Sequence, residues 1–144
     1  MEGRSRAALF LVEKLIVIAV FALCAAACVD IFANAFLTAS SAKDLSNALT
    51  TAKNGAERYK ANESITETAR ALGGTANNAE GTSAAVYYDK DWQISSESEA
   101  AYILHMTHIS SNTPPQLCHI AVTKVSGEEI VSFTVAARGA NDQS

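Results

Sequence analysis

The chain has 144 residues and a mass of 15.2 kDa, which is enough for one domain of ordinary size. Its net charge of -4 disfavours a nucleic-acid-binding protein, because phosphate binding needs clustered Lys and Arg. With 49% hydrophobic and 18% charged residues, the composition excludes disorder of the whole chain. The mean hydropathy of +0.09 is high for a soluble domain and indicates a membrane-attached protein.

The apolar residues gather near the N-terminus. From Ala7 to Val29, only Glu13 and Lys14 are not apolar. A membrane-spanning helix needs about 20 residues, so this stretch is long enough to cross a bilayer. Arg4 and Arg6 precede it, and the positive-inside rule therefore places the N-terminus in the cytoplasm and most of the chain outside.

Three interpretations of this segment compete. Ala25–Ala27 is typical of a secretory signal cleavage site, and Cys28 could be the lipidated residue of a lipoprotein; the third interpretation is an uncleaved membrane helix. Apolar residues continue beyond Cys28 mostly at helical spacings, namely at Ile31, Phe32, Phe36, Leu37, Leu45, Leu49, Ala52, Ala56 and Tyr59. This continuation favours one helix of roughly 50 residues, with a first half in the membrane and an amphipathic second half.

The carboxylate of Glu13 is costly inside the apolar run, on the order of 2.5–3.5 kcal/mol at the bilayer centre. Glu13 and Lys14 could both reach water near the cytoplasmic face. Glu13 could instead meet a partner charge that another subunit supplies. The composition of the segment leaves both readings open.

The residues around Glu13 resemble the N-terminal signature of type IV pilin-like proteins, which include the pseudopilins of type II secretion. A short basic leader ends in a small residue, Ala8, and four apolar residues from Leu9 onward precede a glutamate at the fifth position. Ala8 stands where Gly is commoner and Leu9 where Phe or Met is usual, and Lys14 adds a charge beside Glu13. The motif covers about the first 30 residues of the chain.

The resemblance implies that a prepilin peptidase cuts between Ala8 and Leu9 and that the new amine of Leu9 is methylated. It also implies that Glu13 pairs with that amine on a neighbouring subunit during filament assembly, unless Lys14 pairs with Glu13 internally. The expected partners are the membrane, other copies or other pilin-like subunits, the peptidase and an assembly platform.

We therefore expect three parts: a basic leader at 1–8, a membrane and filament-core helix at 9–37, and an extracytoplasmic head at 38–144. The expected function is that of a structural subunit, a pilin or pseudopilin, stored in the cytoplasmic membrane as a single-pass protein and assembled into a surface or envelope filament. The alternative is an uncleaved single-pass membrane protein whose outer domain binds a ligand or partner.

The head begins with helical segments. The long helix is predicted to end near Ala61, and Gly55 marks a bend or a close-packing point within it. A capping box formed by Ser64 and Glu67 opens a short helix over 64–72, which Gly73–Gly74 ends. Residues 75–83 are predicted to form a loop.

A β-meander over 85–137 follows. A hairpin pairs 85–88 with 92–95, and three longer strands occupy 101–109, 116–125 and 129–137. The turns between the longer strands are expected at Pro114–Pro115 and Ser126–Gly127. Apolar side chains alternate along these strands, so one face of an antiparallel sheet needs a cover. The predicted fold class is α+β: the long helix packed on a small antiparallel sheet of about four to five strands.

No combination of residues predicts an enzyme, a metal site or a cofactor site. The three histidines, His105, His108 and His119, do not have the spacing of zinc ligands. Cys24 and Cys28 lie one helical turn apart, a poor geometry for a disulfide, and Cys118 is expected in the core.

Two further groups of residues have simple structural explanations. The acidic residues Asp89, Asp91, Glu97 and Glu99 fit a solvated turn better than a calcium loop. Trp92 is expected to pack across strands with Tyr87 and Tyr88 rather than to form a ligand platform.

Overall fold

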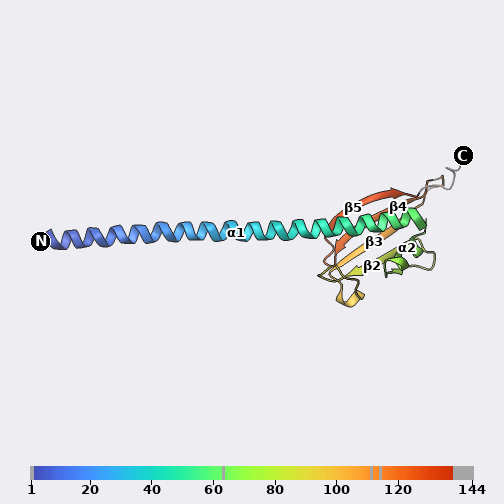
Figure 1. Cartoon of the computed structure of the whole chain (residues 1–144), viewed down its shortest axis with the longest axis horizontal. Coiled ribbons are helices and arrows are strands. Elements are labelled where there is room, and N and C mark those ends of the chain that lie inside the picture. The colour runs from blue at the N-terminus through green and yellow to red at the C-terminus, as the bar shows by residue number, and fades with distance from the viewer. Residues whose placement is uncertain (1, 63, 111, 114, 138–144) are drawn as a thin grey trace. The chain divides into compact units, whose positions relative to one another are not determined.

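The computed structural model of the chain describes residues 2–62, 64–110, 112–113 and 115–137. The fold is α+β, as the sequence predicts, with a long N-terminal helix packed on an antiparallel sheet (Figure 1). Contacts divide the chain into two compact units, one up to Ala42 and one from Lys43 onward. We refer to residues 2–42 as the N-terminal segment and to the described residues from Lys43 onward as the head.

Helix α1 runs over Glu2–Asn62 and contributes to both units, and helix α2 (Ile65–Ala71) belongs to the head. The sheet consists of five strands: β1 (Thr75–Ala76), β2 (Ser83–Tyr88), β3 (Tyr102–Ile109), β4 (Leu117–Lys124) and β5 (Glu129–Ala136). A short 3-10 helix, η1 (Glu97–Glu99), precedes β3. Every strand pairs antiparallel with its neighbour in sequence, so the order is β1-β2-β3-β4-β5.

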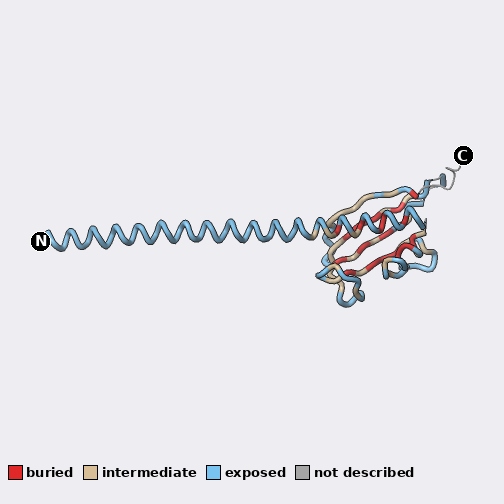
Figure 2. Tube along the Cα trace, viewed as in Figure 1, coloured by how far each residue is buried: buried red, intermediate tan, exposed pale blue. Residues whose placement is uncertain are grey.

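The core of the head lies between the last turns of α1 and one face of the sheet (Figure 2). The helix presents mostly small buried residues: Ala48, Ala52, Gly55, Ala56 and Tyr59. The strands present Val86, Leu104, Met106, Cys118, Ile120 and Val122. An added Cβ at Gly55 would lie 3.4 Å from Leu104 Cδ2, so the helix packs closely on β3 at the glycine that the sequence singled out.

Strands β3, β4 and β5 confirm the three longer predicted strands to within about two residues. The start of α2 also agrees, since Ser64 Oγ accepts a hydrogen bond from the Glu67 backbone N–H at 3.4 Å. Gly73 follows α2 with a φ of 83°, which favours glycine. The predicted turn at 114–115 includes Pro114, which lies outside the described residues.

Two local predictions were wrong. Residues 92–95 do not form the second strand of a hairpin, because only the bridge between Tyr88 and Ile94 joins them to β2. The left-handed conformation of Trp92, with a φ of 61°, bends the chain out of the sheet at this point. The predicted loop over 75–83 contains β1, whose Thr75 and Ala76 pair with Ala85 and Ala84 of β2.

The turn before Trp92 explains this unusual backbone. Asp89 Oδ1 accepts hydrogen bonds from the backbone N–H groups of Asp91 and Gln93, at 2.8 and 2.9 Å. The Trp92 ring stacks on Tyr102 with 4.0 Å between ring centroids, and it lies 6.3 Å from the Tyr88 ring. The stack offsets the cost of a non-glycine residue in this conformation, which is roughly 1–2 kcal/mol.

We expect Trp92→Gly to be more stable than Trp92→Ala by about 1 kcal/mol, although both variants lose the stack and unfold more easily than the wild type. The measurement is urea unfolding of the full chain in detergent, followed by near-ultraviolet circular dichroism. The matched control is Gln93, which has no positive φ, so Gln93→Gly should be less stable than Gln93→Ala. Equal stability of the two Trp92 variants would contradict the proposed strain.

Candidate functional site

The N-terminal segment exposes its apolar side chains along its length (Figure 2). Phe21, Phe32 and Phe36 are 76%, 78% and 75% exposed. Helix α1 contains an 18-residue window of mean hydropathy 2.8, of which 0% is buried. It is therefore a candidate membrane-spanning helix near the N-terminus, and it fits a single-pass, membrane-associated protein.

Ala8, Leu9 and Glu13 all lie in this exposed part of α1. Leu9 and Glu13 are four residues apart, so their side chains lie on one face, separated by one helical turn of about 6 Å. Lys14 Nζ lies 5.2 Å from the centroid of the Phe10 ring, a cation–π distance. Among the described residues, no side chain forms an ion pair with Glu13. The carboxylate is thus available to a group outside this copy.

The three histidines of the head lie on β3 and β4. Partial burial lowers the pKa of His105 from its ordinary value of 6.5. His108 Nε2 lies 2.8 Å from Gln116 Oε1, and His119 is paired in register with Thr107. Within the described ranges, no group of three or more His, Cys, Asp or Glu side chains could hold a metal ion.

The other polar candidates also have structural roles. Cys118 is buried in the core, and this burial raises the pKa of its thiol to about 11, so the thiol is a poor nucleophile. The Asp89 carboxylate caps its own turn. Glu97 and Glu99 lie in η1 and are exposed to solvent.

A hydrogen bond between α1 and β3 has no counterpart in the sequence predictions. The Tyr102 hydroxyl donates a hydrogen bond to Asp44 Oδ1 at 2.9 Å. Burial and the nearby Asp44 carboxylate both raise the pKa of Tyr102. Trp92 stacks on the ring of Tyr102. Tyr102, on β3, therefore contacts both α1, at Asp44, and the turn after β2, at Trp92. The partners are 58 residues apart, so no local pattern predicts the bond.

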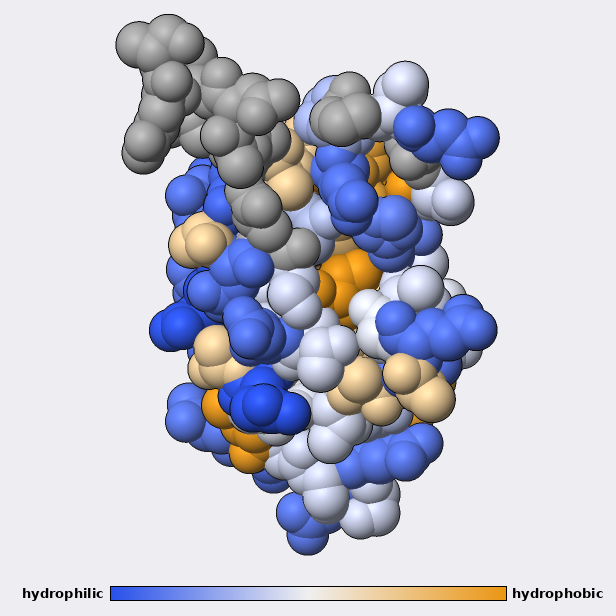
Figure 3. All heavy atoms as spheres, turned by 90° about the vertical axis from the view of Figure 1, so that its right-hand side faces the viewer, coloured by the Kyte–Doolittle hydropathy of each residue, from blue (hydrophilic) through white to orange (hydrophobic). Residues whose placement is uncertain are grey.

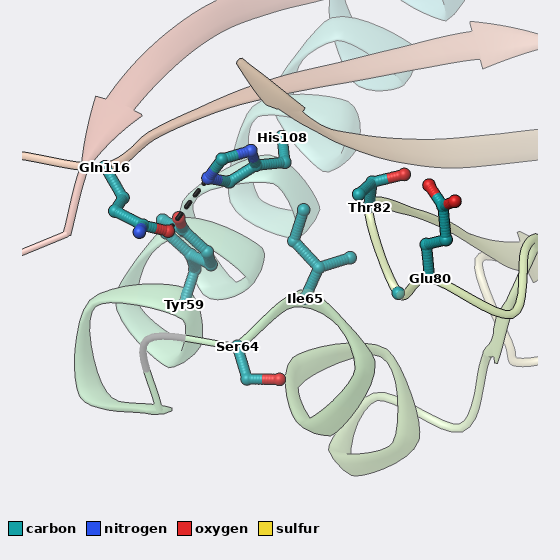
Figure 4. Close-up of a pocket in the computed structure, with 8 residues that line it drawn as sticks. Tyr59, Ser64, Ile65, Glu80, Thr82, His108 and Gln116 are labelled. Carbon is teal, nitrogen blue, oxygen red and sulfur yellow. Dashed lines mark hydrogen bonds between the residues drawn. The ribbon is translucent and has the colours of Figure 1, made fainter. Parts of the chain in front are cut away.

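The head also contains an open pocket of about 280 Å³ (Figure 4). Its lining residues come from α1, the start of α2, the loop before β2, β3 and the start of β4: Tyr59, Ser64, Ile65, Glu80, Gly81, Thr82, His108 and Gln116. In Figure 4 the hydrogen-bonded His108 and Gln116 lie across the pocket from Glu80 and Thr82. The pocket offers polar groups of both kinds, donors and acceptors, to a small polar molecule.

The surface of the head contrasts with that of the N-terminal segment. Figure 3 shows one face of the molecule, on which hydrophilic side chains surround small, separate hydrophobic patches. Large exposed apolar residues of the head are few: Leu45, Leu49, Ile94, Ile109 and Val125. Such scattered residues are ordinary on a soluble surface, whereas the continuous apolar surface of the N-terminal segment is not.

Comparison of the chain with protein-family models, with curated proteins and with solved structures found no match. The geometry defines a class rather than a particular protein: a chain whose described residues contain one candidate membrane-spanning helix and an α+β head.

We expect the stability of the head to fall as the pH drops below about 6.5, in part through His105. Its pKa is lowered in the folded state, so the unfolded chain takes up the proton first and is stabilised by it. His105→Gln should reduce the fall in melting temperature between about pH 7.5 and 5.5. The melting temperature is followed in detergent by the fluorescence of Trp92, the single tryptophan. An unchanged fall in the variant would contradict this assignment.

Proposed function

We propose that the chain is a structural subunit of the pilin or pseudopilin type, which a prepilin peptidase processes after Ala8 and which assembles into a filament. The observation that carries the proposal is an exposed apolar helix in which a carboxylate, Glu13, is the fifth residue after the proposed cut. The proposed machine resembles a type IV pilus or a type II secretion system.

The exposed apolar surface supports this proposal on energetic grounds. Burial of apolar surface contributes about 25 cal/mol per Å², so residues 9–37 are stable only when something covers them. Lipid covers them while the subunit is stored in the membrane. After assembly, the same residues of other copies cover them, and the heads remain in water.

The position of Glu13 gives the assembly its direction. A cut after Ala8 creates a positive amine on Leu9, and an amine and a carboxylate in an apolar environment stabilise each other. Glu13 has no ion pair within its own described chain, so the amine of a neighbouring copy can serve as its partner. The acidic head is then extracytoplasmic, and the basic leader is cytoplasmic.

A second candidate is an uncleaved single-pass membrane protein whose head binds a ligand. The pocket lined by His108, Gln116, Glu80 and Thr82 supports this alternative. In that case the leader would remain attached, and the exposed helix would serve only as an anchor.

We expect Glu13→Gln to be inserted and processed normally but to reach the sheared filament fraction at less than about one-tenth of the wild-type level, since it leaves the amine of its neighbour unpaired. The measurement is immunoblotting of filaments and membranes from cells that carry each variant. Glu2→Gln is the matched control, because it removes a carboxylate from the leader, which the filament lacks. Filaments with a wild-type amount of Glu13→Gln would contradict the proposed pairing.

A further inference from the structure

Two opposite charges bound the longest uninterrupted apolar stretch of α1. Lys14 and Asp30 enclose Leu15–Val29, which has 15 residues. As a helix this stretch spans about 22 Å, whereas the hydrocarbon core of a bilayer is about 30 Å thick. A single copy therefore thins the membrane or draws at least one charge below the interface, and a short stretch of this kind favours association between copies.

The Asp30 carboxylate reaches the aqueous interface less easily than the Lys14 amine does. Its side chain is short, while a lysine can extend its long stem toward the interface. The helix continues with exposed apolar residues after it, including Phe32 and Phe36. Within the described part of the chain, no side chain forms an ion pair with Asp30.

The surroundings of Asp30 form a polar stripe. Asn34 and Thr38 follow Asp30 at spacings of four, so the three residues share one face of the helix. Thr38 Oγ1 donates a hydrogen bond to the backbone oxygen of Asn34 at 2.9 Å, so this hydroxyl is satisfied within the helix. Phe32 and Phe36 lie on a different face, which can contact lipid.

Helix geometry relates the two charges. They are 16 residues apart, which corresponds to about 24 Å along the axis and about 160° around it. Lys14 and Asp30 thus point to nearly opposite sides of the helix. A second, parallel copy displaced by about 24 Å would place its Lys14 beside Asp30 of the first copy. The unpaired Asp30 and the polar stripe favour a polar partner for this face, and the complementary charge of Lys14 favours another copy of the chain.

We propose that Lys14 of one copy pairs with Asp30 of a parallel neighbouring copy in the membrane and in the filament. The Lys14 face of one copy contacts the Asp30 face of the next. Each copy can therefore contact one neighbour through Lys14 and another through Asp30. Contacts of this type extend without closing, as a filament requires. The inference rests on the proposed function in that several parallel copies lie side by side, and it uses residues other than Glu13 and the amine of Leu9.

The test is disulfide crosslinking of two differently tagged full-length chains in native membranes, with Cys24→Ala and Cys28→Ala in both. One chain carries Phe21→Cys, which lies on the Lys14 face, and the other carries Leu37→Cys, which lies on the Asp30 face. These two positions are also 16 residues apart, as Lys14 and Asp30 are. We expect this pair to crosslink at least about tenfold more than the matched control of Phe21→Cys with Ala26→Cys, which shares the face but not the displacement.

Charge exchange tests the ion pair itself. Lys14→Asp in the Phe21→Cys chain should abolish the crosslink, and Asp30→Lys in the Leu37→Cys chain should restore it. Equal crosslinking of the two cysteine pairs, or a double exchange that restores nothing, would overturn the inference. If either result is obtained in cells that still release filaments containing the chain, the Lys14–Asp30 pairing is overturned and the filament function is not. Charge-dependent crosslinks in cells without such filaments support the pairing and overturn the filament function.

Discussion

The protein depends on one constraint, which is that every described residue of the N-terminal segment is exposed although most of them are apolar. In the described residues, the most apolar window of α1 is 0% buried. Such a surface is not stable in water, so it has to lie in lipid or against other apolar helices. The structural subunit that we propose would use both environments in turn, with the same residues in each. Either environment disfavours unpaired charges, so each charged residue in the apolar part of the segment is a candidate for pairing.

In the head, the C-terminal part of α1 covers one face of a small sheet. Alanine and glycine at helical spacings bring α1 close to the sheet, as at Gly55 and Leu104 of β3, and Tyr59 is the large buried side chain of α1. Strand β5 lies at the edge of the sheet, so its Val131, Phe133 and Val135 are only partly buried. The head buries its core without help from the N-terminal segment, because every core residue belongs to the unit that begins at Lys43.

Much of the fold could be predicted because it depends on local patterns. Alternation along 101–137 identifies three strands, and the Ser64 cap with Gly73 identifies α2. The turn at Trp92 could not be predicted, because a stack on Tyr102 holds a bulky residue where glycine is usual. The bond from Tyr102 to Asp44 and the pocket beside His108 join distant parts of the sequence.

The candidate assembly site differs from the pocket in this respect. Ala8, Leu9 and Glu13 lie within two helical turns, so a local sequence motif is enough to propose them. The partners that we propose for them belong to other molecules, so the geometry of one chain gives only their exposure and spacing. No local motif marks Asp30, because the pairing that we propose for it depends on its distance from Lys14 along the helix.

The most direct test of the central claim is the intact mass of the protein extracted from its native membrane. We expect a chain that has lost residues 1–8 and gained one methyl group on Leu9. Ala8→Leu should retain the leader, whereas the matched variant Ala7→Leu should still lose it. A full-length wild-type chain would contradict the claim and favour the anchored ligand-binding protein, and a lipid on Cys28 would contradict it in favour of a lipoprotein.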